Sequence, residues 1–507
     1  MKNILTTLAA ISFLYACNTT KRAGGDDGRI DINIVQINDV YEIAPLENGK
    51  SGGMARVAQL KKDLLATNPN TYMIMAGDFL SPSVYNSLKF ENSRIRGKQM
   101  VAAMNVAGMD LVVFGNHEFD ITENELQQRI NESSFNWVST NTFHKTTSGV
   151  FPFVKKSNDV ASSIPTYYFK SFTDADGTTV KIGFLGITLP FNKASFVVYE
   201  DALETAKNTY NLIKDSCDGV IAITHQLIVD DIALAKAIPG LMLIPGGHEH
   251  DMRFEKIGNV CITKAHANAK SAYVSHIRIN KKTQSFTVKP ELVMIDEHIK
   301  ADSATHEVVK KWVYIADQNF ASIGFDSKDV VLSKGEPLDG RESVIRSQST
   351  NLSQLIISAM EKAAPASNVA IVNSGSIRVD DILFMPVSQY DIIRTLPFGG
   401  AIVEVDMKGK LLEKILISGK SNIGIGGFLQ YSSSLSTDGK IWMIKGVPIQ
   451  EEQIYRVAMT DFLITGGEAN LGFVTKDNPD IIKVYPVIKD LKDPRSDIRL
   501  AIIRYLK

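Results

Sequence analysis

The sequence has few cysteines and no excess of charge of either sign. Three cysteines in 507 residues exclude a disulfide-stapled scaffold and a cysteine-rich zinc or iron–sulfur site. A formal net charge of −1 argues against general nucleic-acid binding, which needs a basic face. We therefore expect no nucleic-acid partner, and any bound metal must be held by histidine, aspartate, asparagine or glutamate.

The first segment has the features of an export signal. Lys2 is followed by the uncharged stretch Ile4–Ala16, which is too short to cross a bilayer as a helix but suits the apolar core of a signal peptide. It ends in Leu14-Tyr15-Ala16-Cys17, which resembles a bacterial lipobox, although tyrosine is unusual there. We expect residues 1–16 to be a signal peptide and Cys17 to carry a lipid anchor to the cell envelope, on its periplasmic side or at the cell surface. The alternative is an ordinary cleaved signal with an incidental cysteine.

The rest of the chain has the composition of a globular protein. Hydrophobic residues make up 44% and charged residues 22%, and the length fits two large domains or about three at most. After a polar tether at 17–28, short apolar runs alternate with helical patterns, which predicts a layered α/β domain over 29–295. Asp296–Phe320 predicts a mostly polar connector helix inside a linker at 296–325. A second mixed α/β domain is expected over 326–507.

Polar residues of one chemical kind follow the apolar runs of the first domain. In open α/β sheets, ligands bind beyond the carboxyl ends of the strands, so these residues can converge on one crevice. Their imidazole, amide and carboxylate groups suit zinc, manganese, iron or cobalt. They are Asp39, Asp78, Asn116, His117, His225, His248 and His250.

Each of these residues alone has a purely structural explanation. An aspartate after a strand often caps a helix, and His225 alone is compatible with a hydrogen-bonded loop histidine. The ordered set carries the prediction, because it offers more ligands than one tetrahedral zinc can use and suits two ions that share Asp78. Two ions about 3.5–4 Å apart can bind one phosphate and convert a water molecule to hydroxide for an in-line displacement.

Several motifs resemble one enzyme family. Asp39, GDFLSPS (77–83), GNHEFD (115–120), ITHQ (223–226) and GGHEH (246–250) are similar to calcineurin-like metallophosphoesterases, and among them to secreted 5′-nucleotidases. RSQSTNLSQLIISAM, IVNSGSIRVDD, LPFGG and DFLITGGEANLGF resemble the nucleoside-binding C-terminal domain of that family. The resemblance covers nearly all of residues 30–485. It implies a four-layer β-sandwich flanked by helices, followed by a mixed α/β substrate-binding domain.

The resemblance also implies roles for the residues. Asp39, Asp78 and His250 would bind one metal ion, and Asp78 would bridge to the other. The second ion's ligands would be Asp78, Asn116, His225 and His248. His117 would contact the phosphate or assist the leaving oxygen, and Asp120 would accept the ring N–H of His117. The ions would be manganese, zinc or cobalt, with iron as a further candidate.

Tyr41 departs from the family pattern. The family has Asp-x-His in its first motif, whereas this sequence has Asp39-Val40-Tyr41. Because the pKa of free tyrosine is about 10, three interpretations stay open. Tyr41 is a phenolate ligand to a harder ion such as iron(III), or a neutral neighbour beside a water ligand, or a sign that the first ion is weakly held.

For the second domain, the resemblance implies substrate recognition. Phe398 and Phe462 match the two stacking phenylalanines, which would clamp a base at roughly 1–3 kcal/mol per stacked ring. Arg346, Asn373 and Arg378 match polar nucleoside and phosphate contacts, and Glu468 stands where the family has aspartate. Taken singly, a phenylalanine is usually core and an arginine usually a solvated surface group. The prediction rests on the whole set.

The expected function is metal-dependent hydrolysis of nucleoside 5′-phosphates, with hinge motion near the connector governing substrate entry. One alternative uses the same metals as a phosphodiesterase for 2′,3′-cyclic nucleotides or nucleotide-sugars. Another is a non-catalytic, nucleotide-binding surface lipoprotein, in which tyrosine at position 41 indicates that one metal site has been lost. The sequence leaves open the metal identity, the oligomeric state and whether Cys217 pairs with Cys261.

Overall fold

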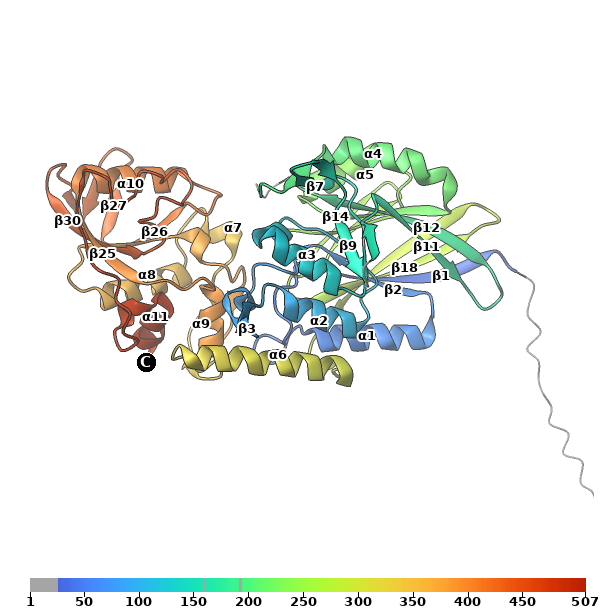
Figure 1. The fold of residues 1–507 in the computed structure, drawn as a ribbon, viewed down its shortest axis with the longest axis horizontal. Coiled ribbons are helices and arrows are strands. Elements are labelled where there is room, and N and C mark those ends of the chain that lie inside the picture. Colours follow the sequence, from blue (N-terminus) through green and yellow to red (C-terminus); the bar gives the residue numbers. More distant parts are fainter. Residues whose placement is uncertain (1–25, 158–159, 191–193) are drawn as a thin grey trace, which may run out of the picture.

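The computed structural model describes residues 26–157, 160–190 and 194–507, so the predicted signal peptide, Cys17 and most of the tether lie outside the described residues. Two domains are joined by the long helix α6 (Ser303–Ser322) (Figure 1). Across the described ranges, no helix is both long and apolar enough to span a membrane. The predicted two-domain α/β fold is confirmed.

The N-terminal domain is built on two six-stranded mixed sheets. The first sheet has the order β19 (Ser285–Met294), β18 (Ser271–Asn280), β1 (Arg29–Ile37), β2 (Thr71–Ala76), β5 (Leu111–Val113) and β6 (Asn136–Trp137). The second has the order β11 (Tyr167–Thr173), β12 (Thr179–Thr188), β14 (Gly219–His225), β15 (Leu243–Gly247), β17 (Val260–Lys264) and β16 (Arg253–Ile257). Strands β1, β2, β5 and β6 run parallel, as do β12, β14, β15 and β17.

Alternate residues of the central strands face opposite cores, as the period of two in a strand requires. Ile32 and Ile34 of β1 share the core between the sheets with Phe184 of β12. Val35 and Ile37 belong to the core on the other face of the first sheet. Strand β1 is therefore buried on two sides.

Helices cover the outer face of each sheet. The first sheet is covered by α1 (Met54–Thr67), α2 (Lys98–Ala107) and α3 (Glu123–Glu132), and the second by α4 (Ala202–Ile213) and α5 (Ile228–Ala237). Helix α3 begins at a capping box in which Thr122 and Glu125 satisfy each other's backbone N–H groups. The four layers, helix, sheet, sheet and helix, are those that the sequence predicts.

Short elements complete this domain. Three small ribbons are β3 (Lys89–Phe90) with β4 (Ser93–Arg94), β9 (Val154–Ser157) with β10 (Val160–Ser163), and β13 (Val197–Tyr199) with β7 (Thr142–Thr146) and β8 (Gly149–Phe151). Single 3-10 turns are η1 (Val84–Ser87), η2 (His117–Asp120) and η3 (Lys214–Ser216).

The connector helix α6 starts later than the sequence predicts. It begins at Ser303 and not at Asp296, because the side chain of Asp302 accepts the N–H of Thr305 and caps the helix there. Val309, Trp312 and Phe320 are buried along one face. This face packs on α1 and α2 of the N-terminal domain.

The C-terminal domain has one five-stranded sheet with the order β26 (Leu429–Tyr431), β22 (Val369–Asn373), β30 (Ile454–Thr460), β25 (Ile402–Lys408) and β31 (Ile481–Val484). Helices α8 (Asn351–Ala363) and α11 (Ile498–Leu506) pack on one face, and α10 (Gly409–Ser421) packs on the other. The remaining elements are α7 (Glu342–Ile345), α9 (Gln389–Thr395), η4 (Ser374–Ser376), η5 (Pro494–Ser496), β20 (Val330–Leu332), β21 (Leu338–Asp339), β23 (Ile382–Leu383), β24 (Val387–Ser388), β27 (Leu435–Thr437), β28 (Trp442–Ile444) and β29 (Val447–Pro448).

Polar contacts join the two domains beside the strand ends. Lys270 Nζ lies 2.5 Å from Asp381 Oδ2, and the buried Glu42 accepts a hydrogen bond from the Tyr390 hydroxyl. Away from this interface, Cys217 and Cys261 are both free thiols. They therefore form no disulfide with each other.

Candidate metal centre

Loops from both sheets meet at one edge of the sandwich. Asp39 follows β1, Asp78 follows β2, His225 ends β14, and His248 follows β15. These strands are parallel within their sheets, so their carboxyl ends point to the same edge. Residues far apart in the sequence are thereby brought together.

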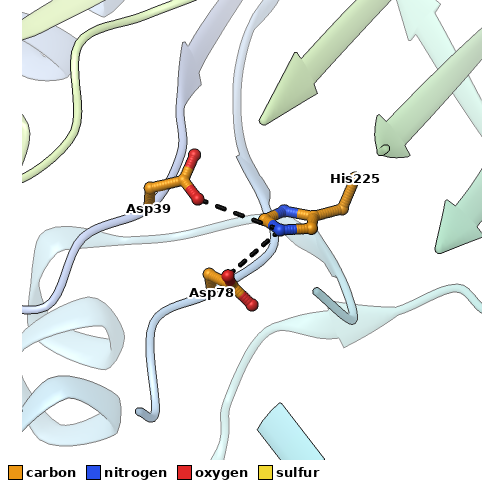
Figure 2. A group of neighbouring side chains, drawn as sticks. All are labelled: Asp39, Asp78 and His225. Atoms are coloured by element: carbon orange, nitrogen blue, oxygen red, sulfur yellow. Dashed lines mark ion pairs between the residues drawn. The ribbon is translucent and has the colours of Figure 1, made fainter. Parts of the chain in front are cut away.

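Asp39, Asp78 and His225 form the centre of this cluster. Figure 2 shows the three side chains pointing toward one another from separate loops. His225 Nε2 lies 3.1 Å from Asp78 Oδ2 and 3.9 Å from Asp39 Oδ1. One ligand atom from each residue lies within 4.8 Å of the others, and all three side chains are buried. This is a metal-binding arrangement of aspartate and histidine.

Three buried ligand atoms in the cluster have no hydrogen-bond partner among the described residues: Asp39 Oδ1, Asn116 Oδ1 and His225 Nε2. His225 Nδ1 donates to the Ala76 carbonyl at 2.8 Å, which leaves Nε2 to present its lone pair. An unpaired buried polar atom costs about 1–3 kcal/mol. Bound cations would satisfy these atoms, so the residues fit a metal.

The pKa values reflect a strongly negative local field. Without a bound cation, burial pushes the pKa of His225 down, but the Asp78 and Asp39 carboxylates override it and raise the pKa to about 9. A cation that binds Nε2 therefore displaces a proton. Burial alone would raise the pKa of Asp78, yet His225 and His117 hold it below its usual range. The same negative field favours a multivalent cation at this position.

His248 and His250 join the cluster from the loop after β15. The backbone N–H of His248 donates to Asp39 Oδ2 at 3.0 Å, and its ring lies 5.4 Å from that of His225. Burial, followed by the charge of His225, lowers the pKa of His248 to about 3, which keeps the imidazole neutral as a metal ligand must be. His250 Nε2 lies 3.5 Å from Asp39 Oδ1.

Tyr41 lies inside the cluster. Its hydroxyl is 2.8 Å from His250 Nε2 and donates to Asp78 Oδ2 at 3.3 Å. Burial, followed by the charges of Asp78 and Asp39, raises the pKa of Tyr41 well above its usual value of 10. Without a bound cation, Tyr41 is therefore the neutral phenol.

His117 begins the turn η2 after β5, and Asn116 directly precedes it. The backbone N–H of His117 donates to Asp78 Oδ1 at 2.8 Å. His117 Nδ1 donates to Asp120 Oδ2 at 2.6 Å, and the Ser81 hydroxyl donates to the same oxygen. Arg378 of the C-terminal domain donates to His117 Nε2 at 3.3 Å. His117 is thus held by one domain and contacted by the other.

The ligand loops adopt uncommon backbone conformations. Asp39, Asp78, His248 and His250 have φ of 52°, 55°, 96° and 63°, a region that few residues other than glycine occupy. Glycine is required beside them, because a Cβ at Gly115 would lie 2.1 Å from Asp78 Oδ1. Such outliers cluster at functional sites, where the surrounding structure enforces them.

Glu118 enforces part of this backbone, a role that was not predicted from the sequence. Its fully buried carboxylate accepts the N–H groups of Asp78, Phe79, Leu80 and Gly115 at 2.9, 2.8, 3.0 and 2.6 Å. It therefore ties the loop after β2 to the loop after β5. The one feature of the sequence that could have indicated this role is the position of Glu118 inside the GNHEFD motif.

Lys264 was not predicted either. It is buried in β17, and its Nζ donates to the carbonyls of Gln226 and Gly247 at 2.5 and 2.8 Å. Asp231 and Glu249 balance its charge at 2.9 and 2.5 Å. Lys264 thus connects the two loops that carry the histidines, and nothing in its local sequence marks it.

A cavity of about 620 Å³ extends from the cluster to the C-terminal domain. Asp78, Asn116, His117, His248 and His250 line it on one side. Arg346, Arg378 and Asp380 line it on the other side. The C-terminal domain therefore closes over the ligand cluster.

Two arginines that line this cavity have N–H groups available to bind an anion. The Nε atoms of Arg346 and Arg378 are buried and have no hydrogen-bond partner within the described residues. Glu342, which was not predicted from the sequence, lies 2.6 Å from Arg346 and 3.6 Å from Arg378. Because a guanidinium can bind a phosphate through several N–H groups, this pair suits an anionic substrate.

The other predicted substrate contacts lie apart from the cavity. Asn373 Nδ2 donates to Glu468 Oε2 at 2.5 Å, so these two residues are adjacent. Phe398 is 68% exposed and Phe462 is 43% exposed. In the described structure, none of the four lines the cavity at the metal cluster.

Comparisons with known proteins match both domains. A family model described as calcineurin-like phosphoesterase matches residues 32–252, and one described as 5′-nucleotidase, C-terminal domain matches residues 330–475. UshA of Yersinia enterocolitica is 25% identical, with 90% of this chain and 91% of that protein aligned. The trifunctional nucleotide phosphoesterase protein YfkN of Bacillus subtilis is 27% identical. The alignment covers 87% of this chain but only 32% of the length of YfkN.

The crystal structure of a 5′-nucleotidase precursor from Thermus thermophilus has the same fold. It aligns with a TM-score of 0.68 at 23% identity and covers 94% of this chain and 96% of its own. The two family models lie on the two structural domains, and the ligand cluster lies within the first. The chain is therefore a phosphoric monoester hydrolase that belongs to the 5′-nucleotidase family, with a calcineurin-like phosphoesterase domain and a 5′-nucleotidase C-terminal domain.

Proposed function

We propose that this protein hydrolyses nucleoside 5′-phosphates to nucleoside and phosphate at a centre for two divalent transition-metal ions. The observation that carries the proposal is the set of unpartnered buried ligand atoms of Asp39, Asn116 and His225 beside Asp78, counted among the described residues. The names of the relatives, nucleotide phosphoesterase and 5′-nucleotidase, supply the substrate class.

The ligands divide between two ions. Asp39, Asp78 and His250 would hold one ion, and Asp78 would be shared. The other ion would be held by Asp78, Asn116, His225 and His248. Imidazole together with carboxylate suits manganese, zinc or cobalt, and iron is compatible. Bound ions supply Lewis acidity that orients the phosphate and lowers the pKa of water.

His117 acts on the phosphate side of the cavity. Its Nδ1 is committed to Asp120, so its Nε2 is the atom that would meet the phosphate or the leaving oxygen. Asp120 stabilises the protonated ring. In the described structure Nε2 accepts from Arg378. Once substrate replaces this contact, a proton on Nε2 would be available to the departing nucleoside oxygen, a role that contributes about 10²–10⁴-fold in comparable enzymes.

The C-terminal domain selects the nucleoside. Arg346 and Arg378 would bind anionic oxygens, Asn373 and Glu468 would contact polar groups of the nucleoside, and Phe398 and Phe462 would clamp the base. The exposure of both phenylalanines supports a clamp. Because neither lines the present cavity, productive binding requires the domains to reorient, as hinge enzymes do.

Asp78→Asn tests the metal centre. The shared carboxylate is replaced by an amide that cannot neutralise two cations, so phosphate release should fall by about 10³-fold or more, and bound metal should drop below two ions per chain. Elemental analysis and phosphate release would be measured together, with the exposed Asp63→Asn as a matched control. Turnover near the wild-type rate would overturn the bridging role.

A substrate screen tests the activity. The hydrolysis products of AMP, a 2′,3′-cyclic nucleotide and UDP-glucose would be separated by chromatography and quantified, with manganese, zinc and calcium added separately. We expect AMP to be preferred with a transition metal. A preference for the cyclic nucleotide or UDP-glucose would support the phosphodiesterase alternative, which the name of the trifunctional relative makes worth testing. No turnover and no bound metal would support a binding protein.

We also propose that the chain is exported and held at the cell envelope by a lipid on Cys17. The supporting observation is the uncharged stretch Ile4–Ala16 directly before that cysteine. In a bacterial host, Cys17→Ala should lose both labelled palmitate and membrane association. Label and fractionation equal to the wild type would contradict the anchor.

A further inference from the structure

One metal-ligand candidate is contacted by the other domain. The carboxylate of Asp380, in the segment between η4 and β23 of the C-terminal domain, accepts a hydrogen bond from His250 Nδ1. Both side chains are only 18% exposed. The chain positions of the two residues differ by 130, so the contact exists only because the domains are docked.

Asp380 is itself held firmly. Its second carboxylate oxygen accepts the backbone N–H of Glu342. Its backbone has φ of 39°, a conformation that a residue with a side chain keeps only when its surroundings enforce it. The carboxylate is therefore aimed at His250 by its own domain.

This contact determines how His250 can bind a metal. Because Nδ1 donates to a carboxylate, Nε2 is the ring atom left to ligate. Nε2 faces the cluster, 3.5 Å from Asp39 Oδ1 and 2.8 Å from the Tyr41 hydroxyl. The tautomer and the ring direction that a metal needs are thus set by a residue of the second domain.

We propose that Asp380 is a positioning residue for the metal ion held by Asp39, Asp78 and His250, and that this ion binds tightly only when the C-terminal domain is docked. The proposal rests on the metal centre of the proposed function but not on the identity of the substrate. Because linkage is reciprocal, loading this ion also favours the docked arrangement. At the second ion, His225 is oriented from within its own domain, by the carbonyl of Ala76.

The neighbouring Asp381 provides a matched control. It also reaches across the interface, where its carboxylate lies 2.5 Å from Lys270. Lys270 is paired with Glu47 at 2.8 Å as well, and neither residue is a predicted metal ligand. Asp381→Asn therefore removes one ion pair across the interface without touching His250, whereas Asp380→Ala removes the contact with the ligand itself.

The experiment is a manganese titration of the full mature chain and its variants by calorimetry, with chelator competition. We expect the wild type to bind two ions, and Asp380→Ala to lose about 10- to 100-fold in affinity at one of them, the range seen when such outer partners are removed. Asp380→Asn retains an acceptor oxygen and should recover part of the loss. Asp381→Asn should stay within about twofold of the wild type at both sites.

Several outcomes would overturn the proposal. Equal affinities in Asp380→Ala and the wild type would remove the positioning role. The same loss in Asp381→Asn would mean that docking in general, and not the contact with His250, sets the affinity. The unaffected second ion reports that each variant is folded. A wild type that binds no manganese would instead refute the metal centre, a failure distinguishable from the others.

Discussion

At the scale of single residues, His117 is separable from the metal ligands. Its ring contacts Asp120 and Arg378, and its backbone N–H contacts Asp78. His117→Ala keeps that backbone contact, so metal content should stay near the wild-type value while kcat falls by about 10²–10⁴-fold. Steady-state kinetics with AMP and elemental analysis on the same preparation would check this.

The matched variant is Asp120→Asn. It leaves His117 in place but removes the negative charge that stabilises the protonated ring, so a smaller loss in kcat is expected. If His117→Ala lost metal and activity in equal proportion, His117 would have to be reassigned from phosphate chemistry to metal binding.

The residues that could be predicted from the sequence are those with a marked local pattern. Asp39, Asp78 and His225 each follow an apolar run, and parallel strands bring such ends together. Asp380 and Lys264 have no such mark, because their partners are distant in the sequence and only the docked fold reveals them. Tyr41 was visible as a departure, but its hydrogen bonds to His250 and Asp78 needed coordinates.

At the scale of elements, Glu118 joins the loops after β2 and β5. Glu118→Ala would leave four buried N–H groups without an acceptor. Unsatisfied buried groups cost about 1–3 kcal/mol each, and partial rearrangement should leave a net loss of about 3–5 kcal/mol in the free energy of unfolding. Urea denaturation followed by circular dichroism would measure it.

Glu118→Gln tests whether the loops need the two acceptor oxygens or only the volume of the side chain, because glutamine keeps the volume. One of its two oxygens becomes an N–H donor, so a loss smaller than that of Glu118→Ala is expected. A Glu118→Ala variant as stable as the wild type would show that the loops do not depend on this carboxylate.

Elements with strong periodicity were predictable, and their ends less so. Helix α1 at Met54–Thr67 is one of the helical patterns that alternate with the apolar runs of the first domain. Helix α6 begins later than predicted because Asp302 caps it. Several polar residues precede Ser303, and the sequence does not show which of them caps the helix. The separation of Phe398 from the metal cavity was not predictable either, since it depends on how the domains are docked.

At the scale of the whole molecule, the buried Glu42 makes the docked state sensitive to pH. Burial raises its pKa to about 7, although Tyr390 and Arg394 act in the opposite direction. A raised pKa means that the folded protein binds this proton more tightly than the unfolded chain. The stabilisation is therefore fully present below about pH 4.5 and is lost as the pH rises through about 7.

Glu42→Gln should remove this pH dependence, because the amide stays neutral and still accepts from Tyr390. Between about pH 5 and 8, the wild type should lose on the order of 3 kcal/mol relative to the variant. Urea unfolding at several pH values would compare them. Parallel curves for the two proteins would contradict the assignment.

The proposed clamp also operates between domains. Phe398→Ala should raise KM for AMP by about 5- to 150-fold, which corresponds to about 1–3 kcal/mol of stacking, and should barely change KM for p-nitrophenyl phosphate. Phe384→Ala is the comparison, because Phe384 is 53% exposed and lines the metal cavity. A parallel loss on both substrates would remove the clamp, and a selective loss in Phe384→Ala would move base recognition to Phe384.

The packing of α6 determines where the molecule can bend. Its buried face packs on α1 and α2, and toward its end Phe320 also meets Tyr390 of the C-terminal domain. We expect the helix to move with the N-terminal domain. Just beyond it, the Phe325 ring lies 5.0 Å from the Arg499 guanidinium of α11 and so moves with the C-terminal domain. We therefore expect the pivot at the few residues between them, around Gly324 with φ of 89°. A rotation of a few degrees at this short joint would separate Asp380 from His250, and opening and loosening of the ion would then be a single event.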